Sequence, residues 1–137
     1  MDREIKFRAW DKEKRNMFNI ARLDIADGTC YDHLFSRNIY DYWNECILMQ
    51  YTGLKDKNGK EIYEGDIVAE RTMGGINYSV VKFGEINISK QACKENPCIC
   101  FYNDYSNFND CWSDEPLNAK KIEVIGNIYE NTELLNS

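Results

Sequence analysis

Polar and apolar residues alternate with a period of two through much of the chain. Near the start, Ile5, Phe7 and Ala9 alternate with charged residues, which gives one apolar and one charged face, as in a half-buried β-strand. Residues 17–25 follow a short charged segment, and we expect them to form the return strand of a hairpin. The opening of the sequence therefore predicts antiparallel β-structure.

Similar strand signals, with frequent β-branched and aromatic residues, extend along the chain. The pair Gly74-Gly75 separates two such runs, at residues 66–73 and 76–88, and indicates a hairpin turn. Residues 103–110 are rich in Asn, Asp and Ser and predict a loop. We expect the remaining strands at residues 47–52, 98–102 and 121–129.

The segment at residues 32–45 is dense in aromatic residues and fits neither the helical nor the strand period. A short helix and two short strands are equally compatible with it. Tyr and Trp are enriched in interface cores, so the segment is a candidate self-association surface. The simpler interpretation, that its aromatic side chains fill a core with few aliphatic residues, is favoured.

The clearest turn signals lie in residues 49–68. Asn58 and Gly59 tolerate positive φ, and Asp56 can accept hydrogen bonds from backbone amides two residues further on, so a tight reversal is expected there. Gly53 interrupts the preceding strand pattern, and Gly65 marks a second turn before the next strand. Backbone geometry alone explains these residues, so we interpret the segment as scaffold.

Three motifs carry a family resemblance. They are Arg-Glu-Ile-Lys-Phe-Arg-Ala-Trp-Asp at residues 3–11, the turn-rich segment 49–68, and Glu-Val-Ile-Gly-Asn-Ile-Tyr-Glu-Asn at residues 123–131. Together and in this order they resemble the YopX family, small proteins encoded by phages and prophages. The resemblance implies a mostly β, self-associating protein with no assigned catalytic residue. Two features depart from the family pattern: Thr132 stands where a proline is expected, and residues 93–111 have no recognisable counterpart.

A chain of 137 residues is long enough for one ordinary domain or two small β units that share a core. We expect a single YopX-like domain over residues 1–137, which allows an N-terminal β unit at 1–52 and a barrel-like unit at 53–137. The predicted fold is mainly β, with antiparallel strands in one or two small barrel-like units. A short C-terminal helix is expected after Asn131, which suits an N-cap position.

Charge and hydropathy limit the cellular compartments and the kinds of binding partner that we expect. Hydrophobic residues make up 43% of the chain and the net charge is −6, so the protein is globular and lacks the basic footprint of a duplex-binding protein. Charged residues near the start exclude an apolar signal core, and no stretch of apolar residues is long enough to span a membrane. We expect a protein of the bacterial host cytoplasm, with its six cysteines reduced.

Two strand segments interleave aromatic and basic residues, at residues 6–10 and 78–83. On a small barrel such strands can stack single-stranded bases. Because the two faces of an ordinary strand account for the same residues, nucleic acid is the alternative partner and not the favoured one.

The candidate metal ligands are Cys93, Cys98, Cys100 and Cys111, whose four thiolates could satisfy tetrahedral zinc. Structural zinc sites use paired knuckles that wrap the ion, whereas Cys98 and Cys100 share one face of an expected strand. The only histidine is His33, and no C-x-x-C motif occurs. Free thiols are therefore favoured, and no cofactor is expected.

No catalytic motif is present. The sequence lacks a G-x-S-x-G elbow, a P-loop, a G-x-G-x-x-G segment and an H-E-x-x-H pair. Its 23 carboxylates are too many for any pair to be informative. We expect a non-enzyme: a self-associating interaction protein that binds a host or phage protein. The alternative is a small β-barrel accessory protein for nucleic acid.

Overall fold

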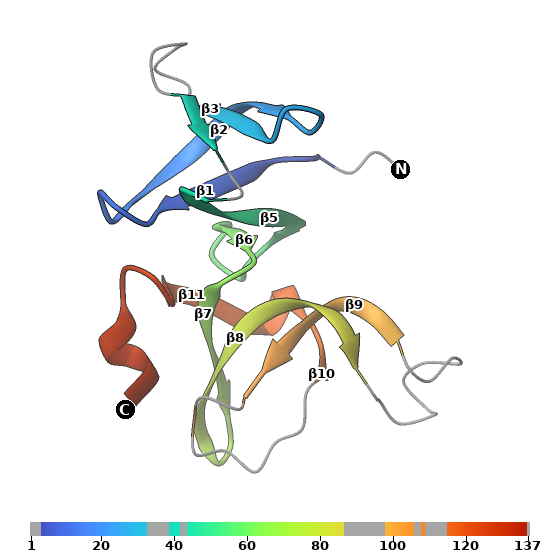
Figure 1. The fold of residues 1–137 in the computed structure, drawn as a ribbon. Helices are drawn as coiled ribbons and strands as arrows, with labels where there is room; N and C mark the ends of the chain where they lie inside the picture. Colours follow the sequence, from blue (N-terminus) through green and yellow to red (C-terminus); the bar gives the residue numbers. More distant parts are fainter. Residues whose placement is uncertain are drawn as a thin grey trace. The chain divides into compact units, whose positions relative to one another are not determined.

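The structure is a computed structural model that describes residues 4–32, 39–41, 44–86, 98–105, 108 and 115–136. The fold is mainly β, with antiparallel strands and almost no helix, as the alternating pattern predicts (Figure 1). The chain divides into two compact units, Met1–Tyr51 and Thr52–Ser137, which we describe separately. None of the helices in the described ranges is long and apolar enough to cross a membrane.

The first unit is a sheet of antiparallel strands in the order β4-β3-β2-β1-β5. Tight turns at residues 12–15 and 25–28 join the first three strands, and residues 39–41 form a short strand inside the aromatic segment. The strands are β1 (Phe7–Asp11), β2 (Asn16–Asp24), β3 (Thr29–Asp32), β4 (Ile39–Asp41) and β5 (Cys46–Lys55), whose last residues enter the second unit. The rest of the aromatic segment, His33 included, lies largely outside the described residues.

The sheet of the first unit has buried apolar residues on both faces. They are Ala9, Trp10, Cys30, Cys46, Met49 and Tyr51. The register of β1 and β5 places Ala9 and Cys46 on one face and Trp10 and Met49 on the other. Phe18 and Tyr40, from β2 and β4, stack with ring centroids 4.6 Å apart.

The second unit holds the larger sheet, in the strand order β10-β9-β8-β7-β11. A hairpin at Gly75 joins β7 to β8, where the Gly pair predicted it. The unit's elements are β6 (Glu61–Tyr63), β7 (Asp66–Thr72), β8 (Gly75–Ile86), β9 (Cys98–Asp104), β10 (Glu115–Pro116), β11 (Ile122–Asn127) and two 3₁₀ helices, η1 (Ala119–Lys121) and η2 (Thr132–Asn136).

Both faces of this second sheet are covered over part of their area. Neighbouring residues of a strand point to opposite faces, so Ile67 and Val68 of β7 belong to different apolar clusters. Val68 packs in a cluster with Ile62, Val81, Ile122 and Val124. Ile67 packs with Val80 and Phe108, and the half-buried Tyr78, Ile128, Leu134 and Leu135 lie against that cluster. The run of consecutive apolar residues in β7 and β8 reflects this double burial.

The predicted barrel-like closure is wrong. In each sheet the strand order is open, and no described strand joins the two edges. The physical reason in the second unit is that the outer edge of β11 is already occupied by the loop after Asp56, described below.

The predicted C-terminal helix is only a 3₁₀ turn, η2. Asn131, which directly precedes η2, accepts the N–H of Asn127 with its side-chain oxygen at 3.1 Å. The next backbone bond, from the N–H of Leu134 to the carbonyl of Asn131 (3.0 Å), has the i to i+3 spacing of a 3₁₀ helix.

Two strand boundaries also differ from the expectation. Strand β5 continues through Gly53, which has a φ of 85° and lies within the strand instead of ending it. Strand β9 includes Asn103 and Asp104, which the polar composition assigned to a loop. Both side chains are buried, and Asp104 pairs with Lys82 of β8, so tertiary contacts outweigh the local polarity.

Candidate functional site

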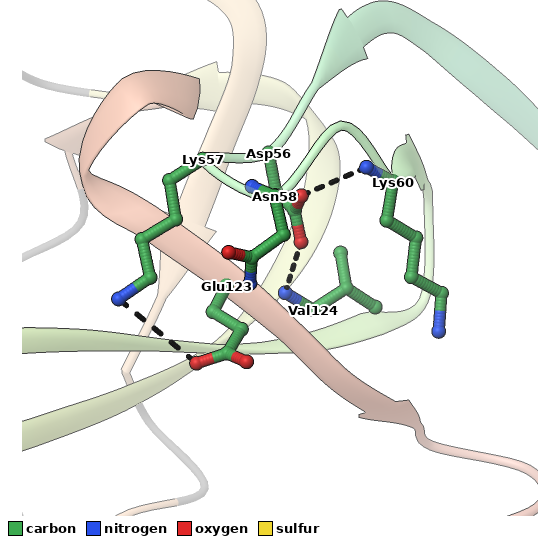
Figure 2. A network of polar contacts seen from close by, with 6 residues as sticks. All are labelled: Asp56, Lys57, Asn58, Lys60, Glu123 and Val124. Carbon is green, nitrogen blue, oxygen red and sulfur yellow. Dashed lines mark hydrogen bonds and ion pairs between the residues drawn. The ribbon is translucent and has the colours of Figure 1, made fainter.

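The candidate site lies at the edge of the second unit's sheet that β9 and β10 form. The opposite edge is formed by β11. At that opposite edge the loop 56–60 lies along β11 (Figure 2). The N–H of Lys57 donates to the carbonyl of Ile122 (3.1 Å), and the N–H of Val124 donates to the Asp56 carboxylate (2.9 Å). These outward-facing groups would otherwise be free to pair with another chain.

The turn residues build this contact from within the loop. The other carboxylate oxygen of Asp56 accepts the N–H groups of Asn58 (2.8 Å) and Lys60 (2.9 Å), as the turn chemistry predicts. Gly59 has a φ of 85°, where a glycine is favoured. Asp56 is 6% exposed, so its carboxylate is almost completely enclosed by backbone donors.

Burial by itself would raise the pKa of Asp56. The N–H donors of Val124, Lys60 and Asn58 and the charge of Lys60 outweigh burial and hold the pKa below its usual value. The charged carboxylate is therefore the bound form, and it replaces a neighbouring strand along part of β11.

The third motif, residues 123–131, also forms hydrogen bonds with backbone groups. The side-chain oxygen of Asn127 accepts the N–H groups of Tyr129 (3.0 Å) and Glu130 (2.8 Å). The N–H of Ile128 donates to the carbonyl of Gly65, 2.9 Å away, which ties this motif to the central one. A Cβ added at Gly126 would lie 2.5 Å from the side-chain oxygen of Asn131. The polar residues of these two motifs thus serve the scaffold.

In the part of the chain that the structure describes, the other edge of the sheet is open along part of its length. Strand β10 pairs with β9 only at Asn103 and Tyr102. The N–H of Leu117 then donates to the carbonyl of Phe101 (3.2 Å), after which the chain turns into η1. No described strand continues this pairing along Cys98–Cys100.

Ile99 is the centre of this open edge. The carbonyl of Phe101 faces outward toward Leu117, and backbone groups two residues apart in a strand face the same edge. The N–H and C=O of Ile99 therefore face outward as well. Its side chain is 70% exposed.

An apolar strip accompanies the open edge. The register of β8 and β9 places Phe83 opposite Phe101 and Glu85 opposite Ile99, on one face of the sheet. The rings of Phe83 and Phe101 lie with centroids 4.9 Å apart, and Phe83 is 52% exposed. We call Ile99, Phe83 and Phe101 with the outward backbone of β9 the open-edge site.

Sequence analysis did not identify the open-edge site. Ile99 and Phe101 alternate with Cys98 and Cys100, so residues 98–101 appear in the sequence as a continuous apolar run, a pattern that predicts burial on both faces. Exposure of one face depends on which segments lie over it, and local sequence does not encode that.

The sequence-predicted metal ligands cannot be assembled from the described residues. Cys93 and Cys111 and the side chain of Cys98 lie outside them. Cys100 is described, as a half-buried free thiol in β9. Within the described ranges, no group of three or more His, Cys, Asp and Glu side chains could hold a metal ion.

The two aromatic and basic segments do not present free cations over exposed rings. Lys6 pairs with Glu4 at 3.1 Å and lies over the Tyr51 ring, while Lys82 pairs with Asp104. Ala9 and Trp10 are buried. Of the predicted stacking residues, Phe83 is exposed, but its partner Phe101 places it in the open-edge site.

A polar hollow of about 330 Å³ lies elsewhere in the second unit. Its lining combines one carboxylate and one amine with neutral polar groups. The lining residues are Glu70, Thr72, Asn77, Tyr105, Pro116, Asn118 and Lys121.

Comparison with known proteins agrees with the motifs. The model of a family described as "YopX protein" matches residues 6–136. The crystal structure of protein EF1440 from Enterococcus faecalis is similar, with a TM-score of 0.59 and 24% sequence identity, over 98% of this chain and 99% of that chain. At this identity the likeness shows the fold alone. No curated protein matches the chain.

Proposed function

The chain belongs to the YopX family, and from this premise we propose that it is a phage- or prophage-encoded, non-enzymatic interaction protein. In this proposal it acts in the bacterial cytoplasm, self-associates, and binds a host or phage protein. The open-edge site is the surface it uses for both.

The observation that supports the proposal most is the position of Ile99. Its outward backbone groups offer one hydrogen-bond donor and one acceptor to an extended segment, and its exposed side chain adds an apolar contact. Proteins recognise extended chains at such edges by strand addition, in which the main chain supplies affinity and alternate side chains supply specificity.

A second copy of the chain suits this edge. Two copies of β9 placed antiparallel about a twofold axis would pair Cys98–Cys100 with itself and cover Ile99 and Phe83 of both chains. The edge is short, because the N–H of Leu117 already occupies the carbonyl of Phe101 and β10 pairs with Tyr102 and Asn103 beyond it. A short, partly apolar edge favours reversible association over aggregation.

Sedimentation velocity of the purified chain over a range of concentrations tests self-association. The wild type should shift to a larger species as its concentration rises. Ile99→Pro removes the outward N–H without removing a bond to β8, so it should remain folded and monomeric. Ile99→Lys should act in the same way by adding a charge to the edge. Ile76→Lys changes another exposed isoleucine of the same unit and should leave association unchanged.

A wild type that stays monomeric throughout, or an Ile99→Pro variant that associates like the wild type, would contradict self-association at this edge. Capture of tagged wild type and Ile99→Pro from host cytoplasm, with and without infection, extends the test to other partners. A stoichiometric protein held by the wild type and lost from the variant is the expected result. A gel shift of single-stranded DNA that is sensitive to salt would instead support the nucleic-acid alternative.

A further inference from the structure

The segment between β10 and β11 lies over one face of the second unit's sheet. Leu117 and Ala119 of this segment pack against the apolar cluster of that face. Pro116, Asn118 and Lys121 instead line the polar hollow of about 330 Å³. The apolar residues therefore anchor the segment on the sheet, and its other residues form one wall of the hollow.

Strands β7 and β8 supply a second wall. Glu70 and Thr72 are two residues apart in β7, so both point to the face that Val68 occupies in the cluster. Asn77 of β8 lies directly opposite Glu70. Tyr105, which follows β9 and is 3% exposed, also lines the hollow. Amide, hydroxyl, carboxylate and ammonium groups thus surround one small space.

The described lining carries one charge of each sign, on the carboxylate of Glu70 and the ammonium of Lys121. Among the described side chains, no ion pair joins these two groups or links either of them to another residue. An anionic ligand would meet the carboxylate, and a cationic ligand would meet the ammonium, so repulsion opposes both classes. A ligand that carries one charge of each sign satisfies both groups at once.

A buried amide on the same face also lacks a partner. Asn103 lies opposite Val81 in the register of β8 and β9, and Val81 belongs to the apolar cluster. Asn103 is 1% exposed, and its side-chain oxygen has no hydrogen-bond partner within the described ranges. Buried polar groups are normally bonded. Because Asn103 stands two residues before Tyr105, a molecule held in the hollow, or a water beside it, is a candidate for the missing donor.

We propose that this hollow is a binding site for a free α-amino acid with a neutral polar side chain. Glu70 binds the α-ammonium group and Lys121 binds the α-carboxylate. The amides of Asn77 and Asn118 offer donors and acceptors to the ligand's side chain. The volume lies at the lower end of the range for small-molecule pockets, which suits a ligand of this size. No lining residue belongs to the open-edge site, so this inference goes beyond the proposed function and does not depend on it.

The test titrates the full-length protein with L-serine, L-threonine, L-asparagine and L-glutamine, followed by nuclear magnetic resonance and calorimetry. At least one should bind and shift the backbone resonances of Thr72, Asn77 and Asn118, while those of Ile99 stay in place. Two blocked forms of that amino acid separate its charges, because N-acetylation removes the ammonium and amidation removes the carboxylate. Each should bind roughly tenfold more weakly or worse.

Variants of the lining test the same pairing from the protein's side. Glu70→Gln and Lys121→Gln each remove one charge and should weaken binding by a similar factor. Glu133→Gln and Lys120→Gln make the same charge changes at exposed positions outside the lining and should bind like the wild type. In Glu70→Gln, N-acetylation of the ligand should cause little further loss, because the partner of the ammonium is already absent.

No binding of any of these amino acids at several millimolar would overturn the proposal. Blocked forms that bind the wild type as tightly as the free amino acid would also overturn it, and this comparison decides the point even if a variant does not fold. Equal losses in Lys120→Gln and Lys121→Gln would mean that net charge, and not the hollow, determines the affinity. Binding of D-glucose or cytidine in place of the amino acids would assign the hollow to another class of ligand.

Discussion

Both edges of the second unit's sheet carry outward backbone N–H and C=O groups that need hydrogen-bond partners. The two edges differ in the partners that the described residues supply. At β11, the loop 56–60 satisfies the carbonyl of Ile122 and the N–H of Val124. At β9, the outward backbone of Ile99 faces no described strand, and apolar side chains gather beside it. Among the described residues, the loop 56–60 closes one edge and no strand closes the other beyond Phe101.

This difference assigns separate roles to two parts of the sequence. The central and C-terminal motifs, which carry much of the family resemblance, close an edge and brace a turn. Two residues of the open-edge site, Ile99 and Phe101, lie within residues 93–111, the segment whose sequence has no recognisable counterpart in the family pattern. We infer that the motifs maintain the fold and that partner recognition is encoded outside them.

The strongest way to break the closed edge is Asp56→Ala. It leaves three enclosed N–H groups, those of Asn58, Lys60 and Val124, without acceptors, and we expect the free energy of unfolding to fall by about 3 kcal/mol. Urea denaturation measures the loss. Asp24→Ala removes a similar turn contact, to the N–H of Asp27 at an exposed site, and should cost about 1 kcal/mol or less. Equal losses in the two variants would contradict the role given to β11.

Acid should weaken the same edge by a smaller amount. The pKa of Asp56 is lower in the folded chain than in the unfolded chain, so its contribution is present above the unfolded value and is lost as pH falls through about 4 toward the folded value. A protonated carboxyl still accepts some hydrogen bonds, so the loss is less than in Asp56→Ala. Urea denaturation from pH 7 to pH 3 should show a flatter pH dependence in Asp56→Asn than in the wild type. Identical slopes would exclude Asp56 as a contributor.

Gly126→Ala tests the close contact between Gly126 and the Asn131 side chain in the turn after β11. The added methyl group would displace the Asn131 side chain and break its bond to the N–H of Asn127, so we expect a loss of about 1–2 kcal/mol. Thermal unfolding measures this loss. Removing the Asn131 side chain as well should relieve part of the clash, and a double variant no more stable than Gly126→Ala would argue against that contact as the cause.

Lys57→Ala should have the smallest effect on the closed edge. The Lys57 ammonium lies 4.0 Å from the Glu123 carboxylate, and both side chains are more than a third exposed, so the pair contributes roughly 0.5 kcal/mol or less. Urea denaturation at low and high salt should show little difference from the wild type. A loss near that of Asp56→Ala would mean that charge, and not the backbone acceptor, closes the edge.

Sequence reasoning predicts the local structure well where one residue sets the backbone. Asp56, Asn58 and Gly59 specify their turn through side-chain acceptors and positive φ, and the alternation in β1 and β2 gives the first hairpin. The resemblance to the YopX family, carried by the same motifs, is confirmed over residues 6–136.

The same reasoning does not predict which groups meet across the fold. The bond from Val124 to Asp56 joins residues 68 positions apart. The barrel closure was mispredicted for a related reason: alternation predicts strands, but the partners at the sheet edges depend on long-range contacts. The exposure of Ile99 is also a property of the assembled sheet, so the local sequence does not predict it.

The most direct measurement is amide hydrogen exchange at Val124 and Ile99 in dilute protein, followed residue by residue by nuclear magnetic resonance. The Val124 amide should exchange slowly, because it is bonded to the enclosed Asp56 carboxylate, and the Ile99 amide should exchange rapidly. Raising the protein concentration should protect Ile99 and leave Val124 unchanged. Rapid exchange at Val124, or protection of Ile99 that does not depend on concentration, would contradict the assignment of a closed edge and an open one.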